Sequence, residues 1–453
     1  MPRVTALPAQ LLRGFADLAR RARAASVRGG GPVLVWASTR VEPLGLPWAL
    51  TSPGWVWAKP ARGLAVWASG ETWAAEVSGA GRFSEAARAW RRVAQGALWE
   101  GPLAPVAFAG FAFDAWRGTG LWEGFPEGVV AVPRVLRARI RGSEYLAVGC
   151  LVGPEGGGDE VERTLQALEG AEEASPEATW GQVLRQLPSP ERWMAEVERA
   201  EAACRAGVLR KVVLARCVEV AVRATPDAVL RRLQDRYATC TVFAVARAGA
   251  VFLGASPERL AWVRRGRVAT QALAGTAPRG ALPQEDQRLR AQLQDSAKEA
   301  HEHELVAGHV RDALRPLCVA LHQGRRGVVV LPDLQHLRTP FRGRLTDAVG
   351  ILEVGGRLHP TPAVAGLPVQ AATQWIRQHE PVPRGWYAGT VGWVDVCGAG
   401  ELSVAIRSAL LREGRGWAFS GCGVVAGSQP PREYQESQLK LRAVLEALGV
   451  QGP

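Results

Sequence analysis

The stretch Lys211-Val-Val-Leu-Ala-Arg-Cys-Val-Glu-Val220 has the alternating pattern of a β-strand. Lys211 shares its face with Val213, Ala215 and Cys217, because side chains two apart on a strand point the same way. An apolar face penalises a charged ammonium group, which favours a lysine that can lose its proton. The stretch therefore predicts a sheet strand with a chemically unusual lysine at its start.

The sequence around this strand predicts helices and hairpins. A helix is expected over residues 189–210, before the strand. After it, two hairpins turn near residues 247–249 and 264–266, and the first ends in Val251-Phe-Leu-Gly-Ala-Ser-Pro-Glu258. Farther along we expect one long helix over residues 285–317, loop-rich elements around His336, a glycine-rich strand pair over residues 389–423 and a closing helix over residues 432–448.

The first part of the chain has short strand-like runs separated by Gly/Pro turns, beginning at Val33, Trp55, Leu64 and Pro105. Residues 151–160 and 172–178 are the best loop or linker candidates. We divide the chain into an N-terminal sheet-forming part, residues 1–188, and a catalytic region, residues 189–450. Pattern and composition indicate an α/β or α+β protein.

Length and charge narrow the class of protein. The 453 residues carry a net charge of +12, and the length suffices for a sizeable core. The arginines are scattered and form no basic tract interleaved with aromatic residues, so we expect no nucleic-acid partner. The positive balance also suits an anionic small-molecule substrate.

The cysteines and the hydropathy pattern predict a reduced, cytoplasmic protein. Seven cysteines are widely spaced, without a CxxC pair or zinc-ligand spacing, and are expected to be mostly buried and reduced. No window approaches about 18 consecutive apolar residues, so we expect no membrane span. The amphipathic segment 1–23 lacks the apolar core and cleavage site of a signal peptide.

Lysine is rare in this chain. Of 55 basic residues only Lys59, Lys211, Lys298 and Lys440 are lysines. Arginine keeps its proton at any working pH, whereas a desolvated lysine can act as a base. The lysines within dense motifs are therefore candidates for chemistry, although an arginine-biased composition explains Lys59 equally simply.

Two predicted helices carry a Glu-x-x-Glu pattern on an inward face. In the first, Glu302 and Glu299 continue the apolar line of Val306 and Val310. In the closing helix, Glu436 and Glu433 continue a line that includes Lys440. Such carboxylates can hold a hard, oxygen-liganded cation such as Mg²⁺, although the pattern also occurs among ordinary solvated helix charges.

Other residues carry weaker signals. His301 and His303 are two apart and so do not share a helix face, which argues against zinc. Arg407 ends an apolar strand, where it can bind a carboxylate or lie at the surface. Glycines at strand ends let a ligand reach backbone N–H groups, or simply form turns.

A series of motifs in order resembles the chorismate-utilising enzymes, and within them the isochorismate synthases. The resemblance is strong over residues 189–448 and weak before them, where only Phe108-Ala-Gly-Phe-Ala-Phe-Asp114 contributes. The motifs begin with Lys211-Val-Val-Leu-Ala-Arg216 and continue with Phe252-Leu-Gly-Ala-Ser-Pro-Glu-Arg-Leu260, Leu273-Ala-Gly-Thr-Ala277, Lys298-Glu-Ala-His-Glu-His-Glu-Leu305, Leu337-Arg-Thr-Pro-Phe341, Leu358-His-Pro-Thr-Pro-Ala363, Tyr387-Ala-Gly-Thr-Val-Gly-Trp393 and Ser420-Gly-Cys-Gly423.

The resemblance implies a single large domain of two packed, mainly antiparallel sheets with helices outside. It implies that Lys211 is the general base that activates water to attack C2 of chorismate, and that Glu258 protonates the departing C4 hydroxyl. Glu302 and Glu436 would ligate Mg²⁺, with Glu299 and Glu433 acting directly or through water. The residues implied to hold the substrate are Gly275, Thr276, His336, Tyr387, Arg407, Gly421, Gly423 and Lys440.

The resemblance also leaves alternatives. Sister enzymes use ammonia to make anthranilate or aminodeoxychorismate, but Lys211 is typical of the water-using members. Salicylate synthases go on to eliminate pyruvate, and Ala363 stands where those enzymes commonly have threonine. A protein that binds an anion without catalysis should lack an acid, base or metal position, and none is missing. We therefore expect Mg²⁺-dependent isochorismate formation for menaquinone synthesis, by a monomer without a glutamine amidotransferase subunit.

Overall fold

The computed structural model describes residues 9–29, 31–42, 49–115, 120–154, 181–347 and 349–450. The predicted linker 172–178 and most of the predicted loop 151–160 lie outside these ranges. The helices are α1 (Ala9–Gly29), α2 (Arg82–Gln95), α4 (Pro190–Arg205), α5 (Pro226–Arg236), α6 (Pro283–Asp295), α7 (Ala297–Leu314), α8 (Ile351–Leu358), α9 (Val369–His379) and α10 (Pro430–Ala447).

The strands alternate with these helices along the chain. Before α4 they are β1 (Val33–Val41), β2 (Gly54–Lys59), β3 (Leu64–Val77), β4 (Leu98–Glu100), β5 (Val106–Phe111), β6 (Gly128–Ile140), β7 (Ser143–Val152) and β8 (Gly181–Leu187). After α4 they are β9 (Lys211–Val222), β10 (Thr241–Arg247), β11 (Ala250–Ser256), β12 (Arg259–Arg264), β13 (Arg267–Pro278), β14 (Cys318–Gln323), β15 (Gly327–Val330), β16 (Leu334–Leu345), β17 (Gly366–Leu367), β18 (Thr390–Asp395), β19 (Gly400–Val404), β20 (Ser408–Arg412) and β21 (Arg415–Val424).

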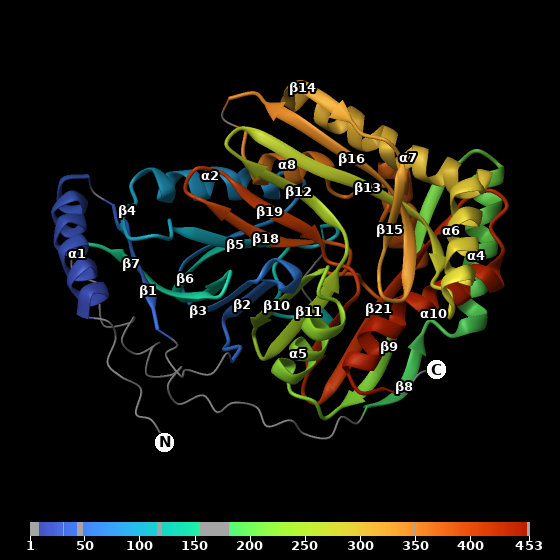
Figure 1. The fold of residues 1–453 in the computed structure, drawn as a ribbon, viewed down its shortest axis with the longest axis horizontal. Coiled ribbons are helices and arrows are strands. Elements are labelled where there is room, and N and C mark those ends of the chain that lie inside the picture. Colours follow the sequence, from blue (N-terminus) through green and yellow to red (C-terminus); the bar gives the residue numbers. More distant parts are fainter. Residues whose placement is uncertain are drawn as a thin grey trace.

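The strands form a mixed α/β domain around a large, mainly antiparallel sheet. Among the described strands only the pairing of β1 with β4 is parallel. One arm runs β8–β9–β21–β20–β11–β10–β2–β3. The other runs β5–β18–β19–β12–β13–β16. The long strand β6 pairs with both β3 and β5, so the two expected sheets are joined into one hydrogen-bonded network (Figure 1).

The early and late parts of the chain share one core. Trp122 stacks on Phe419 at 5.7 Å between ring centroids and meets Phe252 edge-on at 5.1 Å. Each such aromatic contact is worth about 0.5–1.5 kcal/mol beyond the area it buries. Residues before α4 therefore hold together the strands that follow it.

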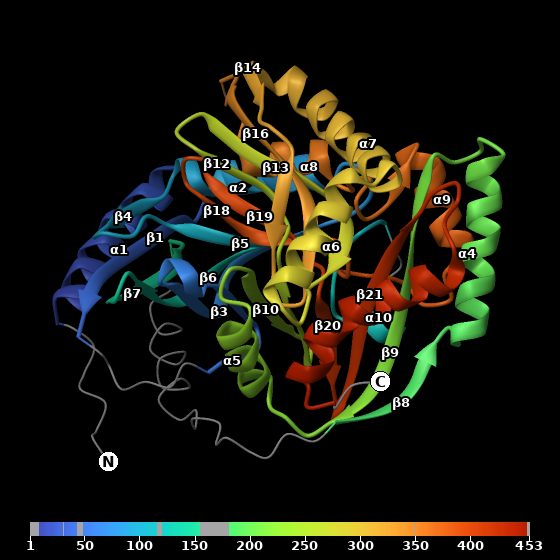
Figure 2. The ribbon, with the colours of Figure 1, turned by 45° about the vertical axis from the view of Figure 1, so that its right-hand side comes forward.

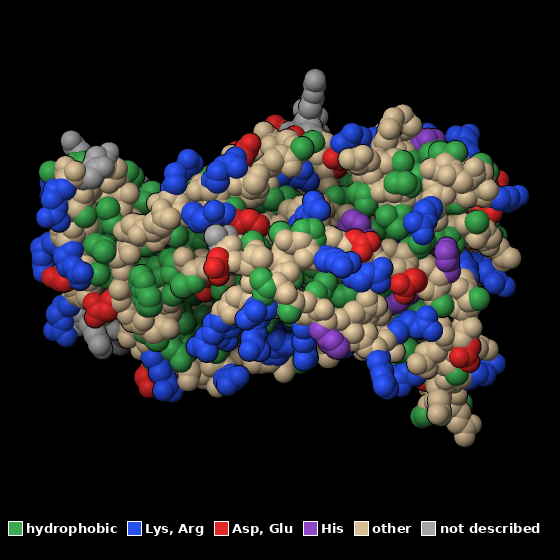
Figure 3. All heavy atoms as spheres, turned by 90° about the horizontal axis from the view of Figure 1, so that it is seen from above, with side chains coloured by type: hydrophobic (Ala, Val, Ile, Leu, Met, Phe, Trp, Pro, Cys, Tyr) green, Lys and Arg blue, Asp and Glu red, His purple; other side chains and the backbone are tan. Residues whose placement is uncertain are grey.

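Helices cover the outer faces of the arms. α7 packs on β13, and α10 packs on β21 beside α4 (Figure 2). α1 packs against β1 at the far end from these helices (Figure 1). Lys and Arg side chains are spread along the face in Figure 3, among apolar and acidic side chains. No described helix is long and apolar enough to span a membrane.

Three predictions about the elements were wrong. The single helix over 285–317 is two helices, because Ser296 is extended and its Oγ accepts a hydrogen bond from the Glu299 amide, which starts α7. The residues around His336 form strand β16 rather than loops, since their backbone pairs with β13. The glycine-rich strand pair is the four strands β18 to β21.

Candidate active site

A cavity opens where β9, β13, β16, β21, α7 and α10 meet, and its empty space, including the part open to solvent, is about 660 Å³. It contains most of the predicted site residues, which come from segments far apart in sequence. Its lining is Lys211, Val213, Pro257, Glu258, Leu273, Ala274, Gly275, Thr276, Glu302, His336, Ala363, Val364, Tyr387, Ala388, Ile406, Arg407, Gly421, Gly423, Glu436 and Lys440. The predicted residues outside this lining are Glu299 and Glu433.

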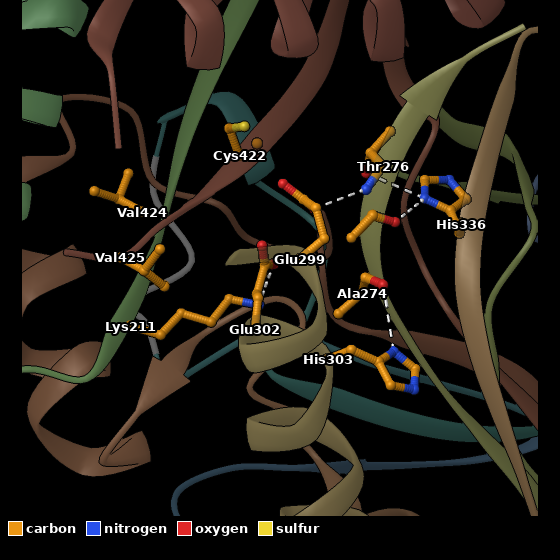
Figure 4. A network of polar contacts seen from close by, with 12 residues as sticks. Lys211, Ala274, Thr276, Glu299, Glu302, His303, His336, Cys422, Val424 and Val425 are labelled. Carbon is orange, nitrogen blue, oxygen red and sulfur yellow. Dashed lines mark hydrogen bonds and ion pairs between the residues drawn. The ribbon is translucent and has the colours of Figure 1, made fainter. Parts of the chain in front are cut away.

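Lys211 begins β9 and is only 1 % exposed. Its Nζ lies 2.8 Å from Oε1 of Glu302, an ion pair visible in Figure 4. Gly423 on the neighbouring strand makes room for both side chains. A Cβ at that position would lie 2.8 Å from Glu302 Oε1 and 2.9 Å from Lys211 Cε. A side chain at this position would therefore displace the ends of Glu302 and Lys211 that meet over the glycine.

Glu258 lies in the short link between β11 and β12. Its amide donates to the Ser256 hydroxyl, and its carbonyl accepts from the Val404 amide, so its backbone is fixed. Burial raises the pKa of its carboxyl to about 7, although the cations Lys211, Arg407 and Lys440 oppose that shift. A carboxyl with this pKa can hold and release a proton near neutral pH.

His336 connects Gly275, where β13 has an irregular register, to Arg407. Its Nδ1 lies 3.2 Å from the Gly275 carbonyl, which can only accept, so Nδ1 carries the proton. Its Nε2 then accepts from Nη2 of Arg407 at 3.5 Å. Burial and the charges of Arg407 and Lys440 lower the pKa of His336 to about 3, so the ring stays neutral. Gly275 has φ +78, a conformation that other residues rarely adopt, at the point where the β13–β16 register shifts.

The opposite wall carries further hydrogen-bonding groups. Lys440 Nζ lies 2.6 Å from Glu436 Oε1 and donates to the Gly421 carbonyl at 3.2 Å. Burial raises the pKa of Tyr387 to about 12, so its phenol keeps its proton and can donate. Arg407 is half-buried in the cavity lining and forms no ion pair with any described carboxylate, so its guanidinium is available to an anionic ligand.

Four carboxylates from α7 and α10 gather at one side of the cavity. Burial and the charges of Glu302 and Glu436 raise the pKa of Glu299 to about 7. Burial alone would raise the pKa of Glu436, but the Lys440 ammonium outweighs it and holds that pKa at about 2. Glu299 Oε2 accepts from the Thr276 amide at 3.2 Å (Figure 4). Oxygen ligands that repel one another fit a hard divalent cation, which relieves the repulsion.

Sequence reasoning missed two contacts in this cluster. Lys298 donates to Glu433 at 2.8 Å, and the Cys422 thiol donates to the other oxygen of the same carboxylate at 2.9 Å. The donor atoms of Cys422, Glu433 and Glu436 lie within 4.8 Å of one another. Because lysine is scarce in this chain, the sequence singled out Lys298 as a candidate. It gave no sign that Cys422 would contact Glu433, because no spacing pattern connects Cys422 with α10.

Two other candidates have structural roles. Lys59 is 9 % exposed and forms an ion pair with Glu401 away from the cavity. Its role is therefore structural, and composition alone does not explain it. His303 is buried, and its ring nitrogens bond to the Ala274 carbonyl and the Thr339 hydroxyl. Five of the seven cysteines are buried, as the sequence predicts for most of them.

A buried lysine, a carboxyl that can hold a proton near neutral pH, a guanidinium and further carboxylates around one pocket are typical of an enzyme that acts on a small anionic molecule. Residues 48–449 match the family model described as chorismate binding enzyme. A salicylate biosynthesis isochorismate synthase from Pseudomonas aeruginosa is 40% identical, covering 93% of this chain and 91% of its own. The isochorismate synthase MenF of Bacillus subtilis is 33% identical, with 81% of each chain covered.

Solved structures agree with these sequence matches. The menaquinone-specific isochorismate synthase MenF from Escherichia coli superposes with a TM-score of 0.76 at 25% identity, covering 94% of this chain and 99% of that one. Anthranilate synthase component I from Streptococcus pneumoniae shares the fold, with a TM-score of 0.69 at 19% identity over 85% of this chain and 93% of that one. The chain belongs to the chorismate-binding enzymes, and within them to the isochorismate synthase family, whose members are isomerase-type enzymes. The resemblance seen in the sequence is thereby confirmed.

Proposed function

We propose that this protein converts chorismate to isochorismate in a Mg²⁺-dependent reaction. The observation that supports the proposal is the convergence of Lys211, Glu258, Glu302 and Glu436 on one cavity. Chorismate is a dianion, and Arg407 offers a guanidinium with no carboxylate partner among the described residues. Membership in the isochorismate synthase family supports the same reaction.

In this proposal, Lys211 accepts a proton from a water molecule as the water oxygen bonds to C2 of chorismate. The ring double bonds shift, the C4–O bond breaks, and Glu258 donates its proton so that the hydroxyl leaves as water. One water is consumed and one is released, so the net reaction is an isomerisation. Glu258 then regains a proton and Lys211 loses one, which restores the starting state.

Mg²⁺ would be held by Glu302 and Glu436, with Glu299 and Glu433 beside them, and it would supply positive charge opposite a substrate carboxylate. Both Glu302 and Glu436 are paired with lysines here. Arg407, Tyr387 and the backbone near Gly421 and Gly423, which line the cavity, would hold the second carboxylate.

The test is product analysis with chorismate and Mg²⁺ in ¹⁸O-labelled water, with and without ammonia. We expect isochorismate as the only product, one solvent oxygen incorporated, and no response to ammonia. Salicylate with pyruvate would support the salicylate synthase alternative, and an aminated product would contradict Lys211 as a base for water.

The matched variants are Lys211→Arg and Lys59→Arg. Arginine can keep an ion pair with Glu302 but cannot give up its proton, so Lys211→Arg should be inactive. Lys59 forms an ion pair outside the cavity, so Lys59→Arg should retain turnover. Activity lost equally in both variants would contradict the assignment of Lys211.

We further propose that the product serves menaquinone synthesis. The likeness to the menaquinone-specific enzyme of Escherichia coli supports this role. The relative from Pseudomonas aeruginosa is named for salicylate biosynthesis, which favours salicylate as a second candidate. Deleting the gene in its host should abolish menaquinone; loss of salicylate with normal menaquinone would favour the second role.

A further inference from the structure

We propose that the buried pair Glu380–Arg384 is a positioning device for Lys211, in which two side chains replace a missing strand beside β9. The inference rests on the proposed role of Lys211 as the base. Glu380 and Arg384 follow α9 and lie outside the cavity lining.

The backbone pairing of β9 has a gap next to the cavity. One edge of β9 pairs with β21 along residues 212–221. On the other edge, β17 pairs with residues 211–212 and β8 with residues 217–222. Residues 213–216 have no strand partner on that edge among the described strands. Their buried polar groups must be satisfied in another way.

Glu380 and Arg384 satisfy groups within this gap. The Ala215 amide donates to Glu380 Oε1 at 2.7 Å, and Arg384 Nη2 donates to the Val213 carbonyl at 2.6 Å. The remaining groups are bound by the Ala365 carbonyl, which accepts from the Val213 amide at 2.9 Å, and by the Trp193 indole, which donates to the Ala215 carbonyl at 3.2 Å. The Glu380 carboxylate and the Arg384 guanidinium thus accept and donate the hydrogen bonds that a neighbouring strand would otherwise make with β9.

The same pair reaches other walls of the cavity. Arg384 Nη1 donates to the Val364 carbonyl at 2.7 Å, and the Arg384 carbonyl accepts from the Tyr387 amide at 2.9 Å. Its Nε donates to Glu380 Oε2 at 2.8 Å, and its guanidinium lies 4.4 Å from the centroid of the Phe113 ring. The side chains are 7 % and 4 % exposed. Few conformations remain open to a planar guanidinium held by this many fixed partners.

We call Glu380 and Arg384, with their bonds to β9, the clamp. The position of Lys211 depends on this clamp because Lys211 lies two residues before Val213 on the same strand face. Its Nζ must reach a water beside the substrate, and a misplacement of about 1 Å can cost about 10²-fold in rate. Arg407, a substrate anchor in the proposed function, lies in the link between β19 and β20 and not on β9. A change in the clamp should therefore act on kcat more than on KM.

The test compares Glu380→Gln and Arg384→Lys with the wild type. We expect kcat to fall about 10- to 100-fold with KM for chorismate within about threefold. The amides of residues 213–215 should exchange with deuterium faster, which is measured by mass spectrometry without any turnover. In Arg384→Ala, added guanidinium ion should restore part of kcat.

The control is Glu144→Gln, which breaks the buried ion pair with Arg137 on β6 and β7, far from the cavity. Glu144→Gln should lower Tm about as much as Glu380→Gln and Arg384→Lys do, whereas its kcat should stay that of the wild type. The inference would be overturned by wild-type kcat in both clamp variants or by a change in KM alone. It would also be overturned if Glu144→Gln lost as much kcat as the clamp variants. If the wild type makes no isochorismate, the proposed function fails, whereas unchanged exchange of residues 213–215 overturns the clamp itself.

Discussion

At the residue scale, the proposed reaction depends on two buried side chains, Lys211 and Glu258. Lys211 is nearly inaccessible, and Glu258 is desolvated with no fixed hydrogen bond to its carboxylate among the described contacts. Desolvation raises the pKa of the Glu258 carboxyl to about 7, which favours the protonated form that can donate to a leaving hydroxyl. Burial of Glu258 thus supplies the protonated acid that the proposed reaction needs.

Lys211→Arg should lower kcat by about 10²- to 10⁴-fold, the usual contribution of a general base. Arginine preserves charge and reach but stays protonated, so the loss reports proton transfer rather than a lost ion pair. Steady-state assay of isochorismate formation measures it. Retention of more than about a tenth of kcat would contradict the role of Lys211 as a base.

The rate should fall above about pH 7. The pKa of Glu258 is raised to about 7, and a general acid works only while protonated, so the active fraction declines as pH rises through that value. A profile of kcat/KM from about pH 6 to about pH 9 measures this limb. Glu258→Gln should remove both the activity and the limb, whereas a wild-type profile that is level above neutrality would contradict the assignment.

At the element scale, the start of helix α7 is set by its N-cap residue, Ser296. The predicted helix over 285–317 ran through Ser296, because helix periodicity continues across it. The structure ends α6 there and caps α7 with the Ser296 hydroxyl, so that Glu299 and Glu302 face the cavity side. A residue that competes with the helix for backbone hydrogen bonds therefore set the direction of the carboxylates.

Ser296→Ala should lower the free energy of unfolding by about 0.5–2 kcal/mol and weaken Mg²⁺ binding. The amide of Glu299 loses its acceptor, so the first turn of α7, which carries the carboxylates, frays. Urea unfolding and Mg²⁺ titration measure the two effects. Ser189→Ala removes an equivalent cap from α4, which carries no site residue, and should lower stability alone. Equal loss of Mg²⁺ affinity in both variants would contradict the link.

Gly423→Ala should reduce kcat by at least about tenfold, because the new Cβ would collide with Glu302 and Lys211 and separate the pair. Circular dichroism should remain that of the wild type. Gly416→Ala on the same strand meets only apolar side-chain atoms at about 3.0 Å. It should keep its activity; equal kinetics in the two variants would show that the glycine above Lys211 is not required.

At the scale of the whole molecule, the site joins two arms of the sheet. Glu302 comes from α7, which packs on β13 of one arm, and Glu436 comes from α10, which packs on β21 of the other. A cation held by both carboxylates would link the arms. Ligands that bind only the folded state stabilise it by mass action.

Mg²⁺ should therefore raise Tm, with about 2.7 kcal/mol of stabilisation at 100 times its Kd. Differential scanning calorimetry with Mg²⁺ and then with excess chelator measures the change without any substrate. Glu302→Gln and Glu436→Gln should abolish the response, whereas Glu144→Gln should preserve it. A chelator-insensitive Tm in the wild type would argue against the cation site.

Local signals in the sequence determined the strand at Lys211, both hairpins, the closing helix and the carboxylate pairs, because periodicity and turn chemistry act over a few residues. Motif order then determined the family. These signals also nominated the residues that line the cavity, although their roles stay predictions.

Only the tertiary structure decided what depends on contacts between distant segments. It joined the two arms through β6, broke the long helix at Ser296, and set His336 on a strand. It also brought Glu380 and Arg384 to the unpaired edge of β9, about 165 residues away from Ala215 in sequence. Such a pair leaves no local pattern, because the backbone groups that it satisfies become its neighbours only when the chain folds.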